Sequence, residues 1–439
     1  MFREAFQELS RVTTNETFTD WQRDFVGPLY RKARGALGDP QKMTVVQLDL
    51  MDHIYALQET RKDQDKERRR ALRESGDAGR QGDAALAQKL ARDARYHETV
   101  RNAATFTIRQ LREIGDMLAW KTLRNRMAIR LMASKSPPGD LPPRDDYLAT
   151  VRDAASESDK LRSYPLLTDV TNLLRHGDVL YIPWDGSRIV RVEELKGRSG
   201  GDPRRHARQL RSLIDLDRLL NQGNGMFDGK LLHLRRCTLR LTHHFDVLRE
   251  TIAAARAGGY AAARVSRNHA IEVLDFTDLD RVERVIEQAR AGPGDEALVG
   301  ARPDDRTFDV GLWPRIEDVM LPAAPWGVYP LPEQDRLDLA SLRLWHRSIL
   351  NVDGLLRDSA AAGAPGELVI EPAAKYMGLR IKMPRVTHEM EASLFTVRVG
   401  LEFLDEGVVL ELLRRPAWPP PPEGSSMMFE FRDEMTLWD

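Results

Sequence analysis

Hydrophobic residues recur at helical spacing through the first third of the chain. The stretches Phe2 to Leu9, Leu50 to Leu57 and Ile108 to Leu118 each place apolar side chains three or four positions apart, which is typical of helices with one buried face. The pattern stops at Ser136 to Pro143, because proline cannot continue a helix. We therefore predict a mainly helical region over residues 1–143.

A strongly charged segment interrupts this helical pattern. It covers Glu59 to Arg70 and is followed by the glycine-containing stretch Ser75 to Asp83. Charge runs of this kind are typical of a solvated helix face or of a mobile connection. The sequence leaves both interpretations open.

The pattern changes to β-type over residues 144–240. After a short helix come two apolar runs, Val179 to Ile182 and Ile189 to Val192, which suit adjacent buried strands. Asp185 and Gly186 lie between them as a turn. A second helix follows, with Asp202 and Pro203 placed to cap and begin it. This stretch predicts a compact β-containing unit.

The remaining residues, 241–439, mix helical and strand patterns. We predict helices near Phe245 to Ala257 and Leu337 to Leu356, and a hairpin over Tyr260 to Phe276. Alternation in Phe395 to Val399 predicts a strand, and Asp405 to Gly407 predicts a turn between strands. The C-terminal region is therefore expected to be α+β.

Composition narrows the class of protein. The chain has 439 residues, enough for two or three domains, and its 66 basic and 67 acidic residues argue against bulk polycation binding. A single cysteine, Cys237, excludes an internal disulfide and a cysteine-based zinc site. A charged start and the lack of a long apolar run predict a cytoplasmic protein that does not enter a membrane.

Three residues in the β-containing unit carry the chemistry. Asp178 begins the first apolar strand, while Glu194 and Lys196 end the second and, being two apart, share a face. Two carboxylates converging from neighbouring strands suit a magnesium ion, and a nearby ammonium could orient or deprotonate the attacking water. This set points to phosphodiester hydrolysis. A Glu-any-Lys triplet arises about once by chance in such a chain, so the inference rests on its context.

Two segments, Gly177 to Leu180 and Glu194 to Lys196, resemble the signature of the PD-(D/E)XK nuclease superfamily. Their two carboxylates, Asp178 and Glu194, are 194 − 178 = 16 residues apart. The resemblance implies an α/β nuclease core with a mixed central sheet flanked by helices, and Mg²⁺-dependent or Mn²⁺-dependent cleavage. It implies that Asp178 and Glu194 bind the metal and that Lys196 positions the water. Gln209 matches a glutamine that some members carry on the following helix.

Members of the superfamily can carry a further acidic residue on the preceding helix. Three residues compete for that position here, namely Glu157, Asp159 and Asp169. The sequence does not choose between them.

A basic helix follows the predicted site. Arg204, Arg205 and Arg208, continued by Arg211, could bind the phosphate backbone of a duplex, but a solvated helix face explains them equally well.

Other chemistry-bearing residues have simpler interpretations. His243 and His244 are adjacent, so on a helix they would point to different faces, and the sequence offers no partner ligands. Trp120 and Trp345 lie among apolar neighbours, which favours a core position over base stacking.

Two functional hypotheses follow from the sequence. The first is a metal-dependent nuclease acting on nucleic acid, with DNA favoured, in bacterial defence or repair. The alternative is a non-catalytic DNA-binding or scaffold protein that keeps an inactive nuclease fold and assembles with itself or a protein partner through its helical region. Magnesium-dependent cleavage would discriminate them.

Overall fold

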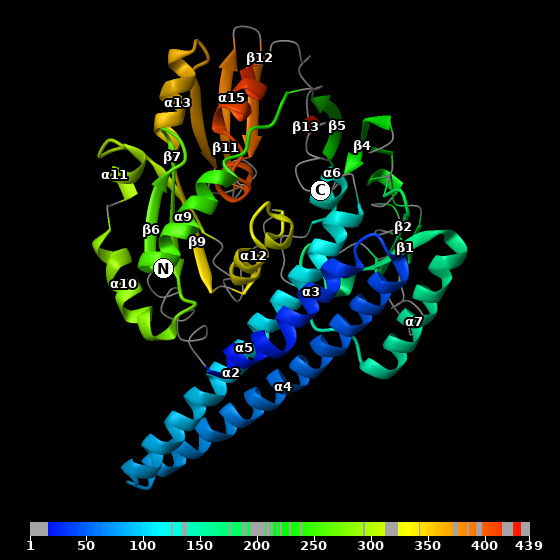
Figure 1. Ribbon diagram of the computed structural model, residues 1–439, viewed down its shortest axis with the longest axis vertical. Coiled ribbons are helices and arrows are strands. Elements are labelled where there is room, and N and C mark those ends of the chain that lie inside the picture. The colour runs from blue at the N-terminus through cyan, green and yellow to red at the C-terminus, as the bar shows by residue number, and fades with distance from the viewer. Residues whose placement is uncertain are drawn as a thin grey trace.

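The computed structural model combines a long helical N-terminal hairpin with a body in which helices and sheets pack together (Figure 1). It describes residues 16–123, 126–133, 138–174, 177–186, 189, 191–193, 207, 211, 214–216, 218–219, 222–227, 230–237, 239–292, 295–311, 324–341, 343–371, 376–383, 386–391, 397–414 and 425–431. The predicted mixture of helix and sheet, with a long helical N-terminal region, is confirmed for these residues.

The N-terminal region is dominated by two long antiparallel helices. Asp39 caps the first by accepting a hydrogen bond from Lys42 N, and Asp83 caps the second by accepting one from Leu86 N. The helices of this region are α2 (Glu16–Trp21), η1 (Gln22–Val26), α3 (Gly27–Ala36), α4 (Pro40–Arg80), α5 (Ala84–Thr122) and α6 (Arg126–Met132). Because α4 continues through the charged run, that run is a helix face; the mobile-connection interpretation is wrong.

The outer part of the α4–α5 hairpin, residues 59–100, forms an arm that projects beyond the body of the molecule (Figure 1). The inner part of α4 buries large side chains such as Leu50 and Ile54. Along the arm, by contrast, α4 buries only Ala71 and Ala78. Small side chains let the two helices approach closely but leave most of the arm surface to solvent.

An antiparallel three-stranded sheet follows the helical region. Its elements are α7 (Arg144–Leu161), β1 (Ser163–Leu167), η2 (Thr168–Val170), β2 (Val179–Pro183) and β3 (Arg191–Glu193), with the strands in the order β1-β2-β3. β2 is buried almost throughout, as its apolar run predicts. The described part of β3 is more exposed than predicted, and β1 is a strand that the sequence analysis missed.

A second three-stranded sheet has the order β13-β5-β4, formed by β4 (Asn224–Phe227), β5 (Lys230–Cys237) and β13 (Ser425–Phe431). β13 pairs with β5 in parallel, so the last strand among the described residues lies beside a strand from the middle of the sequence. The sheet that carries β2 and β3 is wholly antiparallel. Among the described residues, the expected mixed sheet is therefore not built around those two strands.

The C-terminal region contains two further sheets, in the orders β6-β7-β9-β8 and β10-β11-β12. Their strands are β6 (Tyr260–Arg264), β7 (His269–Asp275), β8 (Thr307–Gly311), β9 (Leu344–Asn351), β10 (Gly366–Glu371), β11 (Tyr376–Met383) and β12 (Val386–Glu391). The helices are α9 (Phe245–Gly258), η4 (Leu279–Arg281), α10 (Val282–Ala291), α11 (Asp295–Val299), η5 (Trp326–Val328), α12 (Glu333–Ala340), α13 (Val352–Ala361), η7 (Val397–Leu401) and α15 (Glu406–Arg414).

Three sequence expectations in this region are wrong. The predicted helix over Leu337 to Leu356 is split by β9, whose backbone pairs with β7 and β8. The predicted strand ending at Val399 is a π-helix over the described residues from Val397. Asp405 to Gly407 begins α15, where the Asp405 carboxylate accepts a hydrogen bond from Gly407 N. The predicted helix at Phe245 and the hairpin at Tyr260 are confirmed.

One large hydrophobic cluster joins the helical region to both following regions. It includes Leu50 of α4, Leu118 of α5, Leu180 of β2, Leu248 of α9 and Phe403. None of the described helices is long and apolar enough to cross a membrane.

Candidate functional site

Asp178 lies at a fixed point just before β2. It is almost fully buried, and its backbone N–H donates to the Glu193 carbonyl at 2.8 Å. Gly177 precedes it with φ at 74°, and a Cβ there would overlap Val192. The glycine of the Gly-Asp motif therefore allows the chain to enter β2 close against β3.

Thr168 closes the loop that leads to Asp178. Its backbone N–H donates to the Asp178 carbonyl at 3.0 Å, and its hydroxyl donates to the Gly177 carbonyl at 2.6 Å. These bonds bring η2 beside the start of β2. As a result Asp169, the middle residue of η2, lies in the same neighbourhood as Asp178.

A buried tyrosine, Tyr147, contacts Asp169 directly and lies within the electrostatic reach of Asp178. Tyr147 of α7 donates its hydroxyl hydrogen to Asp169 Oδ2. Burial first, and then the negative charges of Asp169 and Asp178, raise the pKa of Tyr147 well above its ordinary value. Asp169 is only half-buried. Tyr147, Asp169 and Asp178 are called here the acidic cluster, because the charges of both carboxylates act on the phenol, which stays neutral.

Helix α5 supports this cluster from behind. Arg112 Nε donates to the Asp169 carbonyl at 3.1 Å, while the Asp116 carboxylate accepts hydrogen bonds from Asn172 N and Leu173 N. Between them, Gly115 allows the helix to touch the backbone of η2, since a Cβ there would overlap the Val170 carbonyl. Arg112, Gly115 and Asp116 share one helix face because they are three and four positions apart.

The other acidic competitors are placed differently. Glu157 forms an exposed ion pair with Arg191 at 3.3 Å, and Glu193 accepts a hydrogen bond from the Tyr181 hydroxyl at 2.9 Å. Tyr181 also donates to the Ala154 carbonyl of α7. These contacts belong to a polar group separate from Tyr147. The side chain of Asp159 is not described, so Asp169 is the competitor that the structure places near Asp178.

Several predicted site residues lie outside the described part of the chain: Glu194, Lys196, Gln209, Arg204, Arg205 and Arg208. Arg211 is described, as an exposed residue in a helical position. Within the described residues no group of three or more His, Cys, Asp or Glu side chains is arranged to hold a metal. Asp169 and Asp178 carry hard oxygen atoms of the kind that magnesium binds, and two carboxylates alone do not complete its set of ligands.

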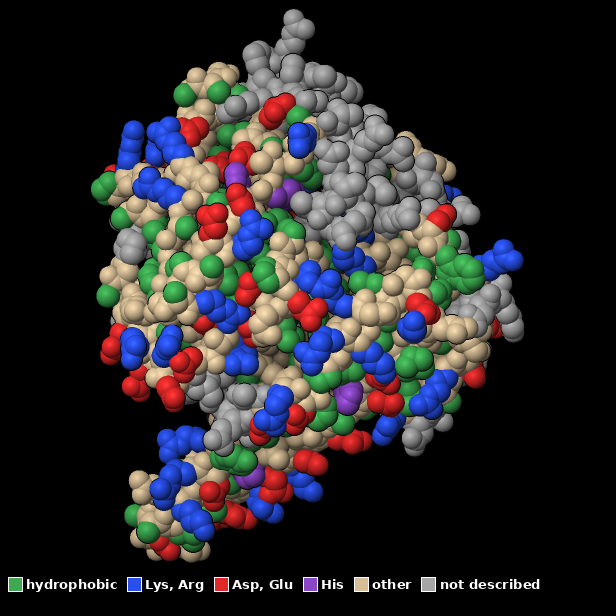
Figure 2. All heavy atoms as spheres, in the orientation of Figure 1, with side chains coloured by type: hydrophobic (Ala, Val, Ile, Leu, Met, Phe, Trp, Pro, Cys, Tyr) green, Lys and Arg blue, Asp and Glu red, His purple; other side chains and the backbone are tan. Residues whose placement is uncertain are grey.

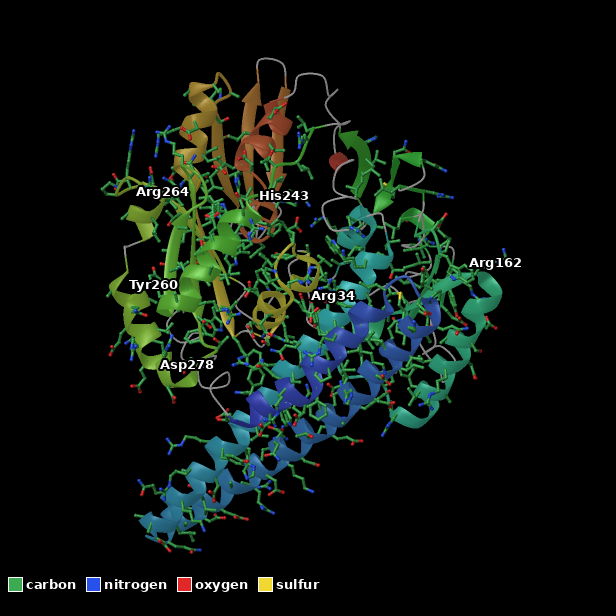
Figure 3. The ribbon with its side chains drawn as sticks, in the orientation of Figure 1. Arg34, Arg162, His243, Tyr260, Arg264 and Asp278 are labelled. Atoms are coloured by element: carbon green, nitrogen blue, oxygen red, sulfur yellow. The ribbon has the colours of Figure 1, made fainter. Side chains whose placement is uncertain are left out.

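His243 and His244 have separate partners. His243 Nδ1 lies 2.8 Å from the Glu402 carbonyl, and His244 Nε2 lies 2.9 Å from Asp405 Oδ2 (His243 is labelled in Figure 3). The hydrogen bond to Asp405 raises the pKa of His244. The structure thus brings neither histidine to the acidic cluster.

A buried histidine pair in the C-terminal sheet was missed by the sequence analysis. His269 Nε2 and His346 Nε2 lie 3.0 and 3.1 Å from Ser348 Oγ, whose hydroxyl donates to the Gly400 carbonyl. Burial lowers the pKa of both rings to about 3, so they are neutral near pH 7. Alternation along β7 and β9 could have indicated buried positions, but not that they meet.

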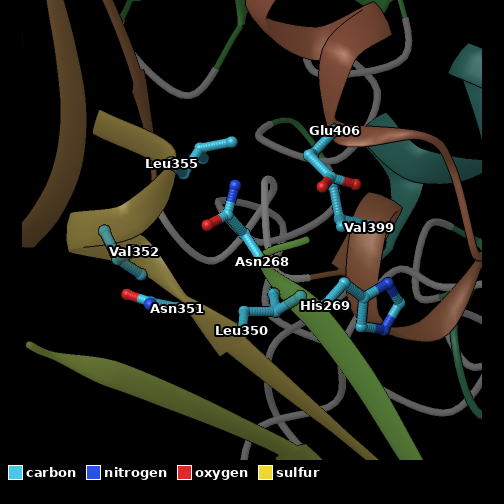
Figure 4. Close-up of a pocket in the computed structure, with 8 residues that line it drawn as sticks. All are labelled: Asn268, His269, Leu350, Asn351, Val352, Leu355, Val399 and Glu406. Atoms are coloured by element: carbon cyan, nitrogen blue, oxygen red, sulfur yellow. The ribbon is translucent and has the colours of Figure 1, made fainter. Parts of the chain in front are cut away.

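A small pocket lies next to this pair, between Asn268, Val399 and Glu406 (Figure 4). Glu406 Oε2 is buried there and has no hydrogen-bond partner among the described residues. Such a space, with a polar atom at its wall, suits ordered water.

Comparison with known proteins adds no relative: no family model, no curated protein and no solved structure matches this chain. Assignment of a function therefore depends on the residues themselves.

Proposed function

We propose that this chain is a metal-dependent nuclease that hydrolyses phosphodiester bonds of nucleic acid, with DNA as the substrate. The hydrogen bond from Asp178 N to the Glu193 carbonyl carries the proposal. It ties Asp178 to the residue immediately before the Glu194–Lys196 triplet. Asp178 and Glu194 are 16 positions apart in sequence, yet the strands beside them are neighbours in the sheet. A metal site with two carboxylate ligands requires such an arrangement.

The acidic cluster supports the same proposal. The Tyr147 hydroxyl holds one Asp169 oxygen in place, and the charges of both Asp169 and Asp178 act on this phenol. In the proposed site Asp178 and Glu194 bind the metal, and Asp169 is the further acidic residue. Magnesium or manganese bound there would polarise the scissile phosphate and lower the pKa of the attacking water.

Two residues of the motif act on water and substrate in this proposal. Lys196 orients the attacking water and balances negative charge that develops on the phosphate. Gln209 helps to position the same water. The proposal requires the Glu194 carboxylate and the Lys196 ammonium to face Asp178.

Adjacent glutamates provide a matched test. Glu194→Gln removes a proposed metal ligand, and we expect it to abolish magnesium-dependent cleavage of DNA. Glu193→Gln keeps an acceptor for the Tyr181 hydroxyl, so we expect cleavage close to that of the wild type. Both purified variants are assayed with plasmid and linear duplex DNA, with EDTA as the metal-free control, and their melting temperatures show whether they fold.

The result also separates the alternative function. Folded Glu194→Gln that cuts as fast as the wild type would refute the proposed site. A wild-type protein that binds DNA but never cleaves it, with either magnesium or manganese, would favour the non-catalytic scaffold.

A further inference from the structure

We propose that the arm binds the phosphate backbone of duplex DNA through a line of cations on α4. The line, called here the arm stripe, consists of Lys62, Lys66, Arg69, Arg73 and Arg80, and all five residues are exposed. The inference rests on the proposed function for its choice of DNA. Its physical basis, however, is independent of the acidic cluster.

Helical geometry puts the arm stripe on one face. Lys66, Arg69, Arg73 and Arg80 follow Lys62 by 4, 7, 11 and 18 positions, and each spacing is close to a whole number of turns. Ala71, which is buried, follows Lys62 by two and a half turns. The stripe therefore points away from α5. Figure 3 shows side chains along the arm projecting outward from its two helices.

Three of the five cations of the stripe form no ion pair with a described residue. Neighbouring cations are paired along the helix: Arg69 with Asp65 at 2.6 Å, and Arg80 with Asp77. Lys62, Lys66 and Arg73, in contrast, form no ion pair with any described residue. Intrahelical pairing of the other charges leaves these three to interact with an external anion.

The arrangement of basic side chains along one face of the arm favours binding to a polyanion whose charges are regularly spaced. Basic and acidic side chains both cover its surface (Figure 2), so the arm is not simply a basic tail. The stripe alone extends for about 27 Å along one straight helix face. A duplex backbone offers phosphates over the same length, at one per 3.4 Å of axis on each strand.

A protein partner fits this surface less well. Protein interfaces rely on aromatic and apolar anchors and are depleted of lysine at their centres. The exposed apolar side chains of the arm, Leu72, Leu86 and Tyr96, lie off the stripe face, so the stripe itself offers no such anchor. Because the arm projects from the body, it could contact the duplex at a distance from the acidic cluster and hold the substrate during cleavage (Figure 1).

The test measures DNA binding without cleavage. A labelled duplex is titrated with full-length protein in EDTA by fluorescence anisotropy, at several salt concentrations. For the variant Lys62→Gln/Lys66→Gln/Arg73→Gln, three lost phosphate contacts should reduce the log–log salt slope by about 2.7. Affinity should fall by up to roughly 500-fold at 0.1 M salt, and the difference should vanish near 1 M.

A matched control removes the same charge elsewhere. Arg249, Arg284 and Arg290 are exposed on α9 and α10 and form no ion pair with a described residue. The triple Arg→Gln variant should keep the wild-type slope. An unchanged slope in the arm variant, an equal loss in the control, or no duplex binding by the wild type in EDTA would overturn the proposal. Failure of the nuclease itself would appear separately, as absent cleavage with slope differences intact.

Discussion

Tyr147 is a positioning residue for the acidic cluster at the scale of single residues. It is buried, and its hydroxyl reaches Asp169, whose carboxylate is half-exposed. A ligand carboxylate held by such a hydrogen bond keeps one orientation, and loss of this kind of support commonly costs 10- to 100-fold in metal affinity, as an order of magnitude. No local pattern points to this tyrosine, because it lies 22 residues before Asp169.

Tyr147→Phe should weaken metal binding while preserving the fold. We expect magnesium or manganese affinity to fall by about tenfold or more, and the free energy of unfolding to fall by about 1 kcal/mol, because one hydrogen bond is lost. Calorimetric titration with Mn²⁺ measures the first quantity. Tyr55→Phe is the control, since the Tyr55 hydroxyl donates to the Pro142 carbonyl and not to a carboxylate. Equal metal affinity in both variants would contradict the role of Tyr147.

Helix α5 acts as the platform for the cluster at the scale of elements. Its face with Arg112, Gly115 and Asp116 fixes both η2 and the turn at Asn172. The close approach at Gly115 involves backbone atoms of Val170, so no side-chain rotation can relieve a larger residue there. The position of Asp169 on η2 thus depends on the lack of a side chain at Gly115 of α5.

Two glycine-to-alanine substitutions should have opposite effects. Gly115→Ala pushes η2 away from α5, and we expect a loss of about 1–3 kcal/mol in stability together with reduced cleavage. Gly35→Ala, in α3, meets no atom within 4 Å and should gain up to about 1 kcal/mol through helix propensity. Urea unfolding of both variants measures these changes. Equal stability of Gly115→Ala and the wild type would show that η2 is not held as described.

The three-stranded sheet depends on the helical region at the scale of the whole molecule. Gln47 of α4 is fully buried, and its amide accepts from Leu167 N and donates to the Pro165 carbonyl. It thereby pairs the free edge of β1. A distant ion pair has a similar linking role: Glu402 binds Arg130 of α6 and Arg398 of η7, with all three side chains buried.

A fragment covering residues 145–237 should therefore be unstable and at most weakly active. The fragment retains Tyr147, Asp169, Asp178 and the Glu194–Lys196 triplet. It loses Gln47 and the whole of α5. Leu131 and Phe245, which flank the fragment, belong to the same hydrophobic cluster as Leu180. A longer fragment, 40–237, restores α4 and α5 and should melt more cooperatively. The comparison uses thermal melting and cleavage; a compact, fully active short fragment would contradict this dependence.

Local patterns in the sequence determined the helical N-terminal region, the strand after Asp178, helix α9 and the hairpin at Tyr260. Each follows from a periodicity or a turn that neighbouring residues decide together. The strand β9 did not follow, because a short apolar run suits both helix and strand until partners such as β7 and β8 supply backbone hydrogen bonds.

The candidate site divides in the same way. The Gly-Asp motif and the strand that follows it could be predicted, because the φ preference of glycine and an apolar run are local properties of the sequence. The structure confirms that β2 and β3 are neighbours. The position of Asp169 near Asp178, with Glu157 turned to Arg191 instead, was set only by tertiary structure. It depends on Thr168, Tyr147 and α5 meeting across long sequence separations, and such contacts arise from packing of the whole chain, which no local pattern encodes.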